Sequence, residues 1–283
     1  MEYVYLNNAV KMPALGLGTF LLSPKDAEEA TYSALRCGYT LIDTANAYMN
    51  ERGVGRGIKR SGVRREDVFL VTKLWPSEYE DADRAIEDTL KRLDTDYIDL
   101  LILHQPVGNF MAGYQAMERA YMAGKVKALG LSNFPEELVQ SVIDACRVNP
   151  QILQVEAHPY YPQTSLKAYL FKYDIKLMAW YPLGHGDKSL VNEAVFTRLA
   201  QKYNKTNAQV ILRWHVQSGN VVIPGSKNPA HIAANLDIFD FALADDEMKE
   251  IAALDKNTRY YNMSLEDAAK TYLNIRPDFN DQE

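Results

Sequence analysis

The chain has 283 residues and a formal net charge of −6, with 47% hydrophobic and 24% charged residues. This balance is typical of a soluble globular protein, and no lysine- or arginine-rich stripe points to a nucleic-acid partner. No signal peptide or membrane span is expected, because residues 1–10 lack a basic region and no apolar run approaches about 18 residues. Cys37 and Cys146 form no CxxC pair, so we expect a cytoplasmic protein without a disulfide framework or a metal site.

The predicted elements begin with a hairpin and continue as a repeating strand–helix pattern. Residues 3–6 and 9–10 flank Asn7-Asn8, which predicts a two-residue turn. Eight candidate strands follow, at residues 14–19, 40–44, 68–73, 97–103, 126–131, 152–157, 176–181 and 220–224. Helices are expected near residues 25–36, 50–60, 80–93, 110–123, 135–146, 164–173, 189–216 (as two helices) and 228–236.

This pattern favours an α/β protein with a single (β/α)8 TIM barrel over residues 1–283, an N-terminal β-hairpin and a C-terminal tail. The strand at 97–103 is almost wholly apolar, as in parallel strands buried on both faces. No linker divides the chain, and the tail beyond Asp255 is expected to fold over one barrel face. A doubly wound dinucleotide-binding fold is the alternative, but its GxGxxG fingerprint is missing, because Leu21 stands where the third glycine belongs.

Four residues, Asp43, Tyr48, Lys73 and His104, fall at or just past the ends of consecutive predicted strands. In a TIM barrel all strand C-termini open onto one face, where the chemistry takes place. Each residue also has an ordinary alternative role: Asp43 as a helix cap, Lys73 in a structural ion pair, and His104 as a core histidine. All four would nevertheless converge on one barrel mouth, which indicates an acid–base site.

The four side chains suit carbonyl reduction. Free tyrosine has a pKa of about 10, too high for efficient proton transfer near neutral pH. A neighbouring Lys73 ammonium is expected to lower the Tyr48 pKa, while Asp43 keeps Lys73 charged and aimed. His104 would orient the substrate oxygen, Tyr48 would give the proton, and a nicotinamide would give the hydride.

The chain resembles the aldo-keto reductases, in particular their bacterial aldehyde and diketo-gluconate reductase-like members, over nearly its full length. The matching segments are Ile42-Asp43-Thr44-Ala45 with Tyr48, Asn50-Glu51, Val54-Gly55, Lys73, His104, Gly130-Leu131-Ser132-Asn133-Phe134 and Ile223-Pro224-Gly225-Ser226. The resemblance implies NAD(P)H-dependent reduction of aldehydes or ketones to alcohols. Tyr48 would be the proton donor, Asp43 and Lys73 would tune it, and His104 would orient the carbonyl.

The resemblance also implies a nucleotide site and a substrate site. Ser132, Asn133 and Gln154 would bind the nicotinamide carboxamide, and Trp180 would stack on its ring. The implied cofactor-binding set is Gly18, Thr19, Phe20, Asp43, Ser132, Asn133, Gln154, Trp180, Tyr181, Pro182, Leu183, Gly184, Ile223, Gly225, Ser226, Lys227, His231 and Asn235. The implied substrate set is Phe20, Tyr48, Trp75 and His104, around a small carbonyl compound, in a protein expected to be a monomer.

Two departures from the family pattern bear on specificity. Relatives often carry a Lys and an Arg that hold the adenosine 2′-phosphate. This chain has Gly225 and His231 at those two positions, and its lysine, Lys227, comes two residues after Gly225. NADPH is expected because Ser226 and Lys227 can still bind phosphate, and NADH is the alternative. Gln105 replaces a large aromatic residue of mammalian relatives, which favours small or polar carbonyls.

Two other functions stay open at this point. A class I aldolase would use Lys73 as a Schiff-base nucleophile, although pairing with Asp43 argues against the neutral amine it needs. A catalytically silent, reductase-like regulatory subunit is compatible with the same fold. Such a subunit would be expected to lack part of the catalytic set, and all four members are present.

Overall fold

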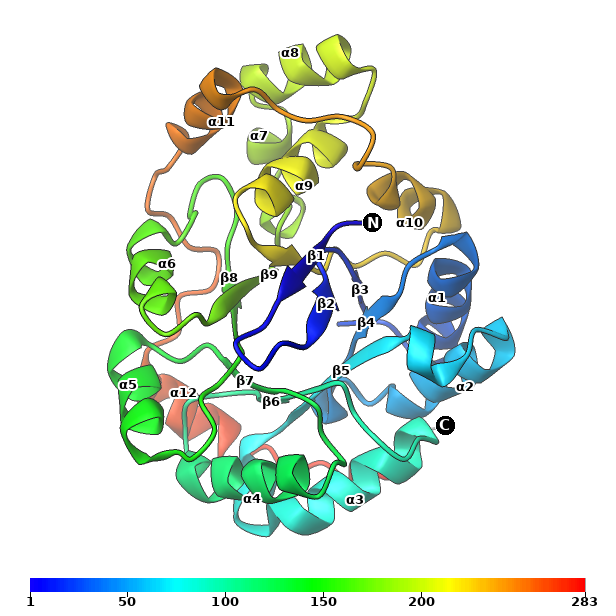
Figure 1. Cartoon of the computed structure of the whole chain (residues 1–283), viewed down its shortest axis with the longest axis vertical. Coiled ribbons are helices and arrows are strands. Elements are labelled where there is room, and N and C mark those ends of the chain that lie inside the picture. The colour runs from blue at the N-terminus through cyan, green and yellow to red at the C-terminus, as the bar shows by residue number, and fades with distance from the viewer. Residues whose placement is uncertain (283) are drawn as a thin grey trace.

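The computed structural model describes residues 1–282 and has a barrel of parallel strands at its centre (Figure 1). The eight strands are β3 (Leu17–Gly18), β4 (Leu41–Asp43), β5 (Phe69–Leu74), β6 (Leu100–Leu103), β7 (Leu129–Ser132), β8 (Ile152–Glu156), β9 (Lys176–Trp180) and β10 (Val221–Val222). Each strand pairs in parallel with the next one along the chain. The predicted (β/α)8 fold is confirmed.

Backbone hydrogen bonds between the first and last strand segments close the barrel. Gly16 N donates to Val222 O at 2.9 Å, and Gly18 N donates to Pro224 O at 3.2 Å. The two segments approach so closely at Gly18 that a Cβ atom there would lie 2.8 Å from the Ile223 carbonyl oxygen. Glycine is therefore required at this junction.

Helices surround the barrel and connect its strands (Figure 1). They are α1 (Pro24–Cys37), α2 (Glu51–Ser61), α3 (Ala82–Leu93), α4 (Phe110–Met122), α5 (Glu136–Ala145), α6 (Thr164–Phe171), α7 (Lys188–Val191), α8 (Ala194–Tyr203), α9 (Asn207–Gln217), α10 (Pro229–Leu236), α11 (Asp245–Ala252) and α12 (Leu265–Tyr272). The sequence signals are clear at α1, where the Ser23 hydroxyl accepts a hydrogen bond from Asp26 N and Gly38 ends the helix with a φ of 109°.

The helices differ from the sequence-based expectation in two respects. The stretch predicted as two helices contains three, α7, α8 and α9. Helices α11 and α12 were not predicted, because a helix of eight residues gives only about two turns of apolar periodicity. No helix within residues 1–282 has the length and apolar character needed to cross a membrane.

The N-terminal hairpin, β1 (Tyr3–Tyr5) and β2 (Lys11–Pro13), packs on the end of the barrel opposite the strand C-termini. Leu6 and Met12 are buried there in the same apolar cluster as Leu41 and Phe69, which begin their strands. The connecting loop has three residues instead of the predicted two. Ala9 N donates to Leu6 O at 2.8 Å, and Ala9 itself has a φ of 66°, as in a type I turn followed by a left-handed residue.

Candidate active site

Polar side chains form the last interior layer of the barrel, directly beyond its apolar filling. Val71 and Ile102 are fully buried in the cluster inside the barrel. Because side chains alternate between the two faces of a strand, Lys73 and His104, two residues later, are also on the interior side. Asp43, Gln154 and Trp180 also follow an interior residue by two positions, on β4, β8 and β9 respectively, so they lie on the interior side too.

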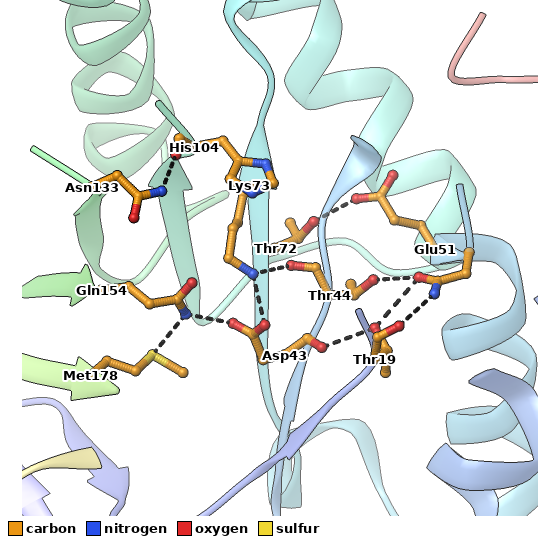
Figure 2. Close-up of polar contacts among 11 residues, drawn as sticks. Thr19, Asp43, Thr44, Glu51, Thr72, Lys73, His104, Asn133, Gln154 and Met178 are labelled. Atoms are coloured by element: carbon orange, nitrogen blue, oxygen red, sulfur yellow. Dashed lines mark hydrogen bonds and ion pairs between the residues drawn. The ribbon is translucent and has the colours of Figure 1, made fainter. Parts of the chain in front are cut away.

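Lys73 and Asp43 form a buried ion pair at the base of this layer. The Lys73 Nζ atom lies 2.7 Å from Asp43 Oδ1 and donates to the Thr44 carbonyl oxygen at 2.8 Å, as Figure 2 shows. Gln154 Nε2 donates to the other carboxylate oxygen of Asp43 at 2.9 Å (Figure 2). Burial raises the pKa of Asp43 and lowers that of Lys73, and the charge of each opposes the shift of the other.

Tyr48 ends a single turn of 3₁₀ helix, Asn46–Tyr48, that follows β4. Its ring centroid lies 4.7 Å from Lys73 Nζ and 5.6 Å from the His104 ring centroid. Phe20, which is 47% exposed, packs against the phenol ring with 5.1 Å between the two ring centroids. The four side chains singled out at the predicted strand ends therefore lie together at one mouth of the barrel.

The pKa of Tyr48 differs from the sequence-based expectation. Lys73 was expected to lower it, but burial raises the pKa of the phenol well above 10, and the Asp43 carboxylate adds to the rise. The main physical reason is burial, which disfavours the charged phenolate, and the negative charge of Asp43 also opposes the effect expected of Lys73. Tyr48 is consequently a fully protonated phenol at neutral pH.

His104 is a neutral imidazole at the same mouth. Burial lowers its pKa well below 6.5, and the Lys73 ammonium lowers it further. Its Nδ1 atom is buried without a hydrogen-bond partner among residues 1–282. The Trp75 ring packs edge-on against the imidazole, with 5.1 Å between centroids. A neutral ring held in this way can donate one hydrogen bond to a bound molecule.

The residues expected to bind a nicotinamide carboxamide lie beside the ion pair. Asn133 follows β7 with a φ of 65°, a conformation that asparagine tolerates better than most residues. Its amide donates to the His104 carbonyl oxygen at 3.3 Å and accepts from the Trp180 indole nitrogen at 3.1 Å. Ser132 is buried at the end of β7, and Trp180 is half-buried at the end of β9. The amide, hydroxyl and indole groups of this wall are thus side by side.

The segment after β9 contains the next predicted residues, Tyr181, Pro182, Leu183 and Gly184. Tyr181 has a φ of 52° and stacks on His185 with 4.3 Å between ring centroids. The backbone of Pro182 is held in place by the buried His215, whose Nε2 atom lies 3.1 Å from the Pro182 carbonyl oxygen. This segment covers one side of the mouth.

The residues expected at the adenosine end lie between β10, α10 and α1. Ser226 accepts a hydrogen bond from Asn228 N at 3.1 Å, while Gly225 and His231 are exposed. Lys227 Nζ lies 3.5 Å from Asp26 Oδ2 in the first turn of α1. Asn235 is buried further along α10, and Thr19 and Ile223 are buried at the barrel closure. The Asp26 carboxylate was not anticipated, because nothing in the sequence pairs it with a residue 201 positions away.

The tail adds residues that sequence reasoning left without a role. Glu156, at the end of β8, is 1% exposed and accepts the backbone N–H of Tyr260 at 2.6 Å and that of Tyr261 at 3.1 Å. Tyr272 on α12 packs against Trp75 with 4.9 Å between centroids and hydrogen-bonds to Tyr261. The tail therefore crosses the mouth, as the sequence predicted for one face of the barrel.

Comparisons with known proteins agree with this arrangement. A sequence profile described as the Aldo/keto reductase family matches residues 14–256. A methylglyoxal reductase, DkgA, of Escherichia coli (strain K12) is 41% identical over 259 residues, covering 90% of this chain and 94% of that protein. Morphine 6-dehydrogenase of Pseudomonas putida is 43% identical over 272 residues, covering 90% of this chain and 92% of that protein.

Solved structures show the same fold. The crystal structure of an aldo/keto reductase from Brucella melitensis superposes with a TM-score of 0.86 at 41% identity, covering 90% of this chain and 99% of that one. An aldo-keto reductase from a Medee basin deep-sea metagenome library gives a TM-score of 0.89 at 39% identity, covering 92% of this chain and 97% of that one. The chain therefore belongs to the aldo/keto reductase family of oxidoreductases.

Proposed function

We propose that this protein reduces aldehydes or ketones to alcohols with a reduced nicotinamide dinucleotide, and that Tyr48 donates the proton. The observation that carries the proposal is the meeting of Tyr48, the Lys73–Asp43 pair and His104 at one barrel mouth. A phenol, a buried ion pair and a neutral imidazole supply a proton donor, a charge stabiliser and a hydrogen-bond donor for a carbonyl oxygen.

The residues beside this group suit a nicotinamide. Asn133 and Gln154 offer amide groups and Ser132 offers a hydroxyl, which are the partners that a carboxamide needs. The half-buried Trp180 ring supplies an apolar platform for a flat heterocycle. When bound, the dinucleotide would supply a hydride from its C4 atom to the carbonyl carbon.

Tyr48 acts as a neutral acid in this scheme. Its O–H bond breaks as the proton passes to the carbonyl oxygen, the product is an alcohol, and solvent later returns a proton to the phenolate. The negative charge on the phenol oxygen exists only while the reaction proceeds, so Lys73 acts where charge develops. Two N–H groups of Lys73 are directed to Asp43 and Thr44, and the Nζ atom lies 4.7 Å from the centroid of the Tyr48 ring, so its positive charge is close to the phenol.

His104 orients the substrate. Because its pKa is lowered, the ring is neutral and carries one N–H. Nδ1 is buried without a partner, and a buried orphan acceptor is tolerated better than a buried orphan N–H, so the proton belongs on Nε2. From Nε2 it donates to the carbonyl oxygen and does not compete with Tyr48 for proton transfer.

NADPH is the proposed dinucleotide, with NADH as a second substrate. Ser226 and Lys227 support a 2′-phosphate, but Asp26 pairs with Lys227 and no arginine stands at position 231. Discrimination between the two dinucleotides is therefore expected to be weak. The carbonyl compound is proposed to be small or polar, because Gln105 faces the site and its amide oxygen accepts from Asn133 at 3.3 Å. The named relatives act on molecules as different as methylglyoxal and morphine.

A carbonyl panel run with both dinucleotides tests the proposal. Carbonyl-dependent oxidation of NADPH or NADH, followed by absorbance, is the expected result. The aldolase alternative predicts instead a covalent adduct at Lys73 after borohydride trapping with substrate. The Lys73 side chain is completely buried and paired with Asp43, which leaves a carbonyl carbon no access to its nitrogen. A silent regulatory subunit would bind dinucleotide and show no turnover.

The remaining expectations about the protein as a whole also stay proposals. We infer a one-domain, cytosolic monomer. The exposed free thiol of Cys37 supports the cytosol, because such thiols persist in reducing compartments. Analytical ultracentrifugation tests the monomer directly, and a sedimentation coefficient of a dimer would contradict it.

A further inference from the structure

The turn that carries Tyr48 must be held in place by residues other than Tyr48, because the phenol itself makes no hydrogen bond with the described part of the chain that would fix it. Within residues 1–282 no hydrogen bond of the Tyr48 hydroxyl contributes to its pKa, so its position depends on the backbone of the Asn46–Tyr48 turn. That turn is short: Tyr48 N donates to Ala45 O at 3.1 Å, and Met49, with a φ of 56°, ends it immediately. A single 3₁₀ turn is weakly stabilised by its own hydrogen bonds.

The side chain of Asn46 ties this turn to a different part of the barrel mouth. Asn46 is completely buried, and its Nδ2 atom donates to Glu78 Oε2. Glu78 belongs to the 3₁₀ segment Pro76–Asp81, which begins two residues after β5 and hence three residues after Lys73. The bond therefore joins the turn of Tyr48 to the segment that follows the strand of Lys73.

The segment that holds Glu78 is itself fixed to the strand of His104. The neighbouring Tyr79 is 1% exposed, and its hydroxyl donates to Gln105 O at 2.9 Å and accepts from Gln105 N at 3.0 Å. Gln105 directly follows His104. Segment 76–81 thus connects all three strand ends that supply the site, and Glu78 is its link to Tyr48.

We propose that Glu78 is a positioning residue for carbonyl reduction: through Asn46 it holds the turn of Tyr48 in register with Lys73 and His104. The proposal rests on the function proposed above. Glu78 does not touch the reacting atoms, so its loss misplaces the proton donor without removing it. A misplacement of about 1 Å can cost up to about a hundredfold in rate.

The charge state of Glu78 gives the proposal a distinctive readout. Burial raises its pKa to about 7; Glu51 on α2 adds to the rise, while Arg92 and Arg84 on α3 and the hydrogen bond from Asn46 oppose it. A carboxylate is a stronger acceptor than a carboxylic acid. As the pH falls through about 7, Glu78 takes up a proton and its hold on Asn46 weakens.

The test uses the full-length protein and five variants: Glu78→Ala, Glu78→Gln, Asn46→Ala, the double variant Asn46→Ala/Glu78→Ala, and Glu80→Gln. Glu80 is an exposed neighbour on the same segment and serves as the matched control. Steady-state kcat and KM are measured with a small aldehyde and saturating NADPH across the neutral pH range. Quenching of tryptophan fluorescence gives the Kd of the dinucleotide, and circular dichroism gives Tm.

Glu78→Ala and Asn46→Ala are each expected to lower kcat by about tenfold while the dinucleotide Kd changes less than about twofold. The double variant should be no worse than either single variant, because both changes remove one interaction. In the unmodified protein kcat should fall toward that of Glu78→Gln as the pH drops through about 7. This acid limb of the pH profile should be absent from Glu78→Gln. Glu80→Gln should behave as the unmodified protein throughout.

Three results would overturn the proposal. The first is an unchanged kcat in Glu78→Ala, and the second is a double variant in which the two losses multiply. The third is a Glu78→Gln variant, folded by its Tm, that keeps the pH limb. An unmodified protein without carbonyl-dependent turnover overturns the proposed function and this proposal together, whereas an active protein insensitive to Glu78 overturns this proposal alone.

Discussion

Replacing Lys73 with methionine separates the structural role of the ion pair from its chemical role. The side chains of Lys73 and Asp43 are 0% and 2% exposed, so the variant leaves a buried carboxylate whose remaining side-chain donor among residues 1–282 is Gln154. Breaking a buried pair in this way typically costs about 3–5 kcal/mol of unfolding free energy. Since stability commonly lies at about 5–15 kcal/mol, the variant is expected to fold but to be clearly destabilised.

The loss should depend on pH in a defined direction. The folded-state pKa of Asp43 is already raised by burial, and loss of the ammonium that opposes this raises it further. As the pH rises, the unfolded carboxyl loses its proton near its pKa of about 3.9, whereas the folded carboxyl keeps its proton to a higher pH. The deficit of Lys73→Met should therefore be small at acid pH and grow as the pH rises through the window between the two pKa values.

The double variant Lys73→Met/Asp43→Asn completes the experiment. Its neutral amide can still accept from Gln154, so most of the lost stability should return in urea denaturation near neutral pH. The kcat for carbonyl reduction should not return, because no ammonium faces the Tyr48 phenolate. A single variant as stable as the unmodified protein at neutral pH, or a double variant with restored kcat, would refute the reasoning.

Two further predictions concern the dinucleotide and the tail. Asp26→Asn should raise kcat/KM for NADPH relative to NADH by about fivefold, because removing one negative charge near the 2′-phosphate is worth about 1 kcal/mol at the surface. An unchanged ratio would mean that the Asp26–Lys227 pair has no influence on the choice of dinucleotide. Glu156→Gln should raise the KM of the carbonyl substrate and accelerate hydrogen exchange at the amides of Tyr260 and Tyr261, because a neutral amide accepts their N–H groups more weakly than a carboxylate. Equal exchange in both proteins would contradict that role of Glu156.

The parts of the site that follow from a strand end could be predicted from the sequence. Lys73 and His104 are visible because an apolar strand that ends in a charged or titratable residue is unusual, and the barrel brings all such ends together. The repeat of apolar runs gave the order of the strands in the same way. Short elements such as α11 and α12 gave too little periodicity to be recognised.

Partners that are distant in the sequence could not be predicted. Glu78 meets Asn46, Glu156 meets the tail at Tyr260, and Asp26 meets Lys227 only because the barrel folds these segments together. Nor did the sequence show that burial outweighs Lys73 in setting the Tyr48 pKa, since the depth of a side chain depends on what packs above it.

The most direct test of the central claim is single-turnover reduction of a small aldehyde by Tyr48→Phe with bound NADPH. The phenylalanine ring keeps the contacts of the phenol with Phe20 and His104, so dinucleotide binding should survive while the rate of NADPH oxidation falls by at least about a hundredfold. A Tyr48→Phe protein that oxidises NADPH at a rate comparable to that of the unmodified protein would show that the proton comes from another group.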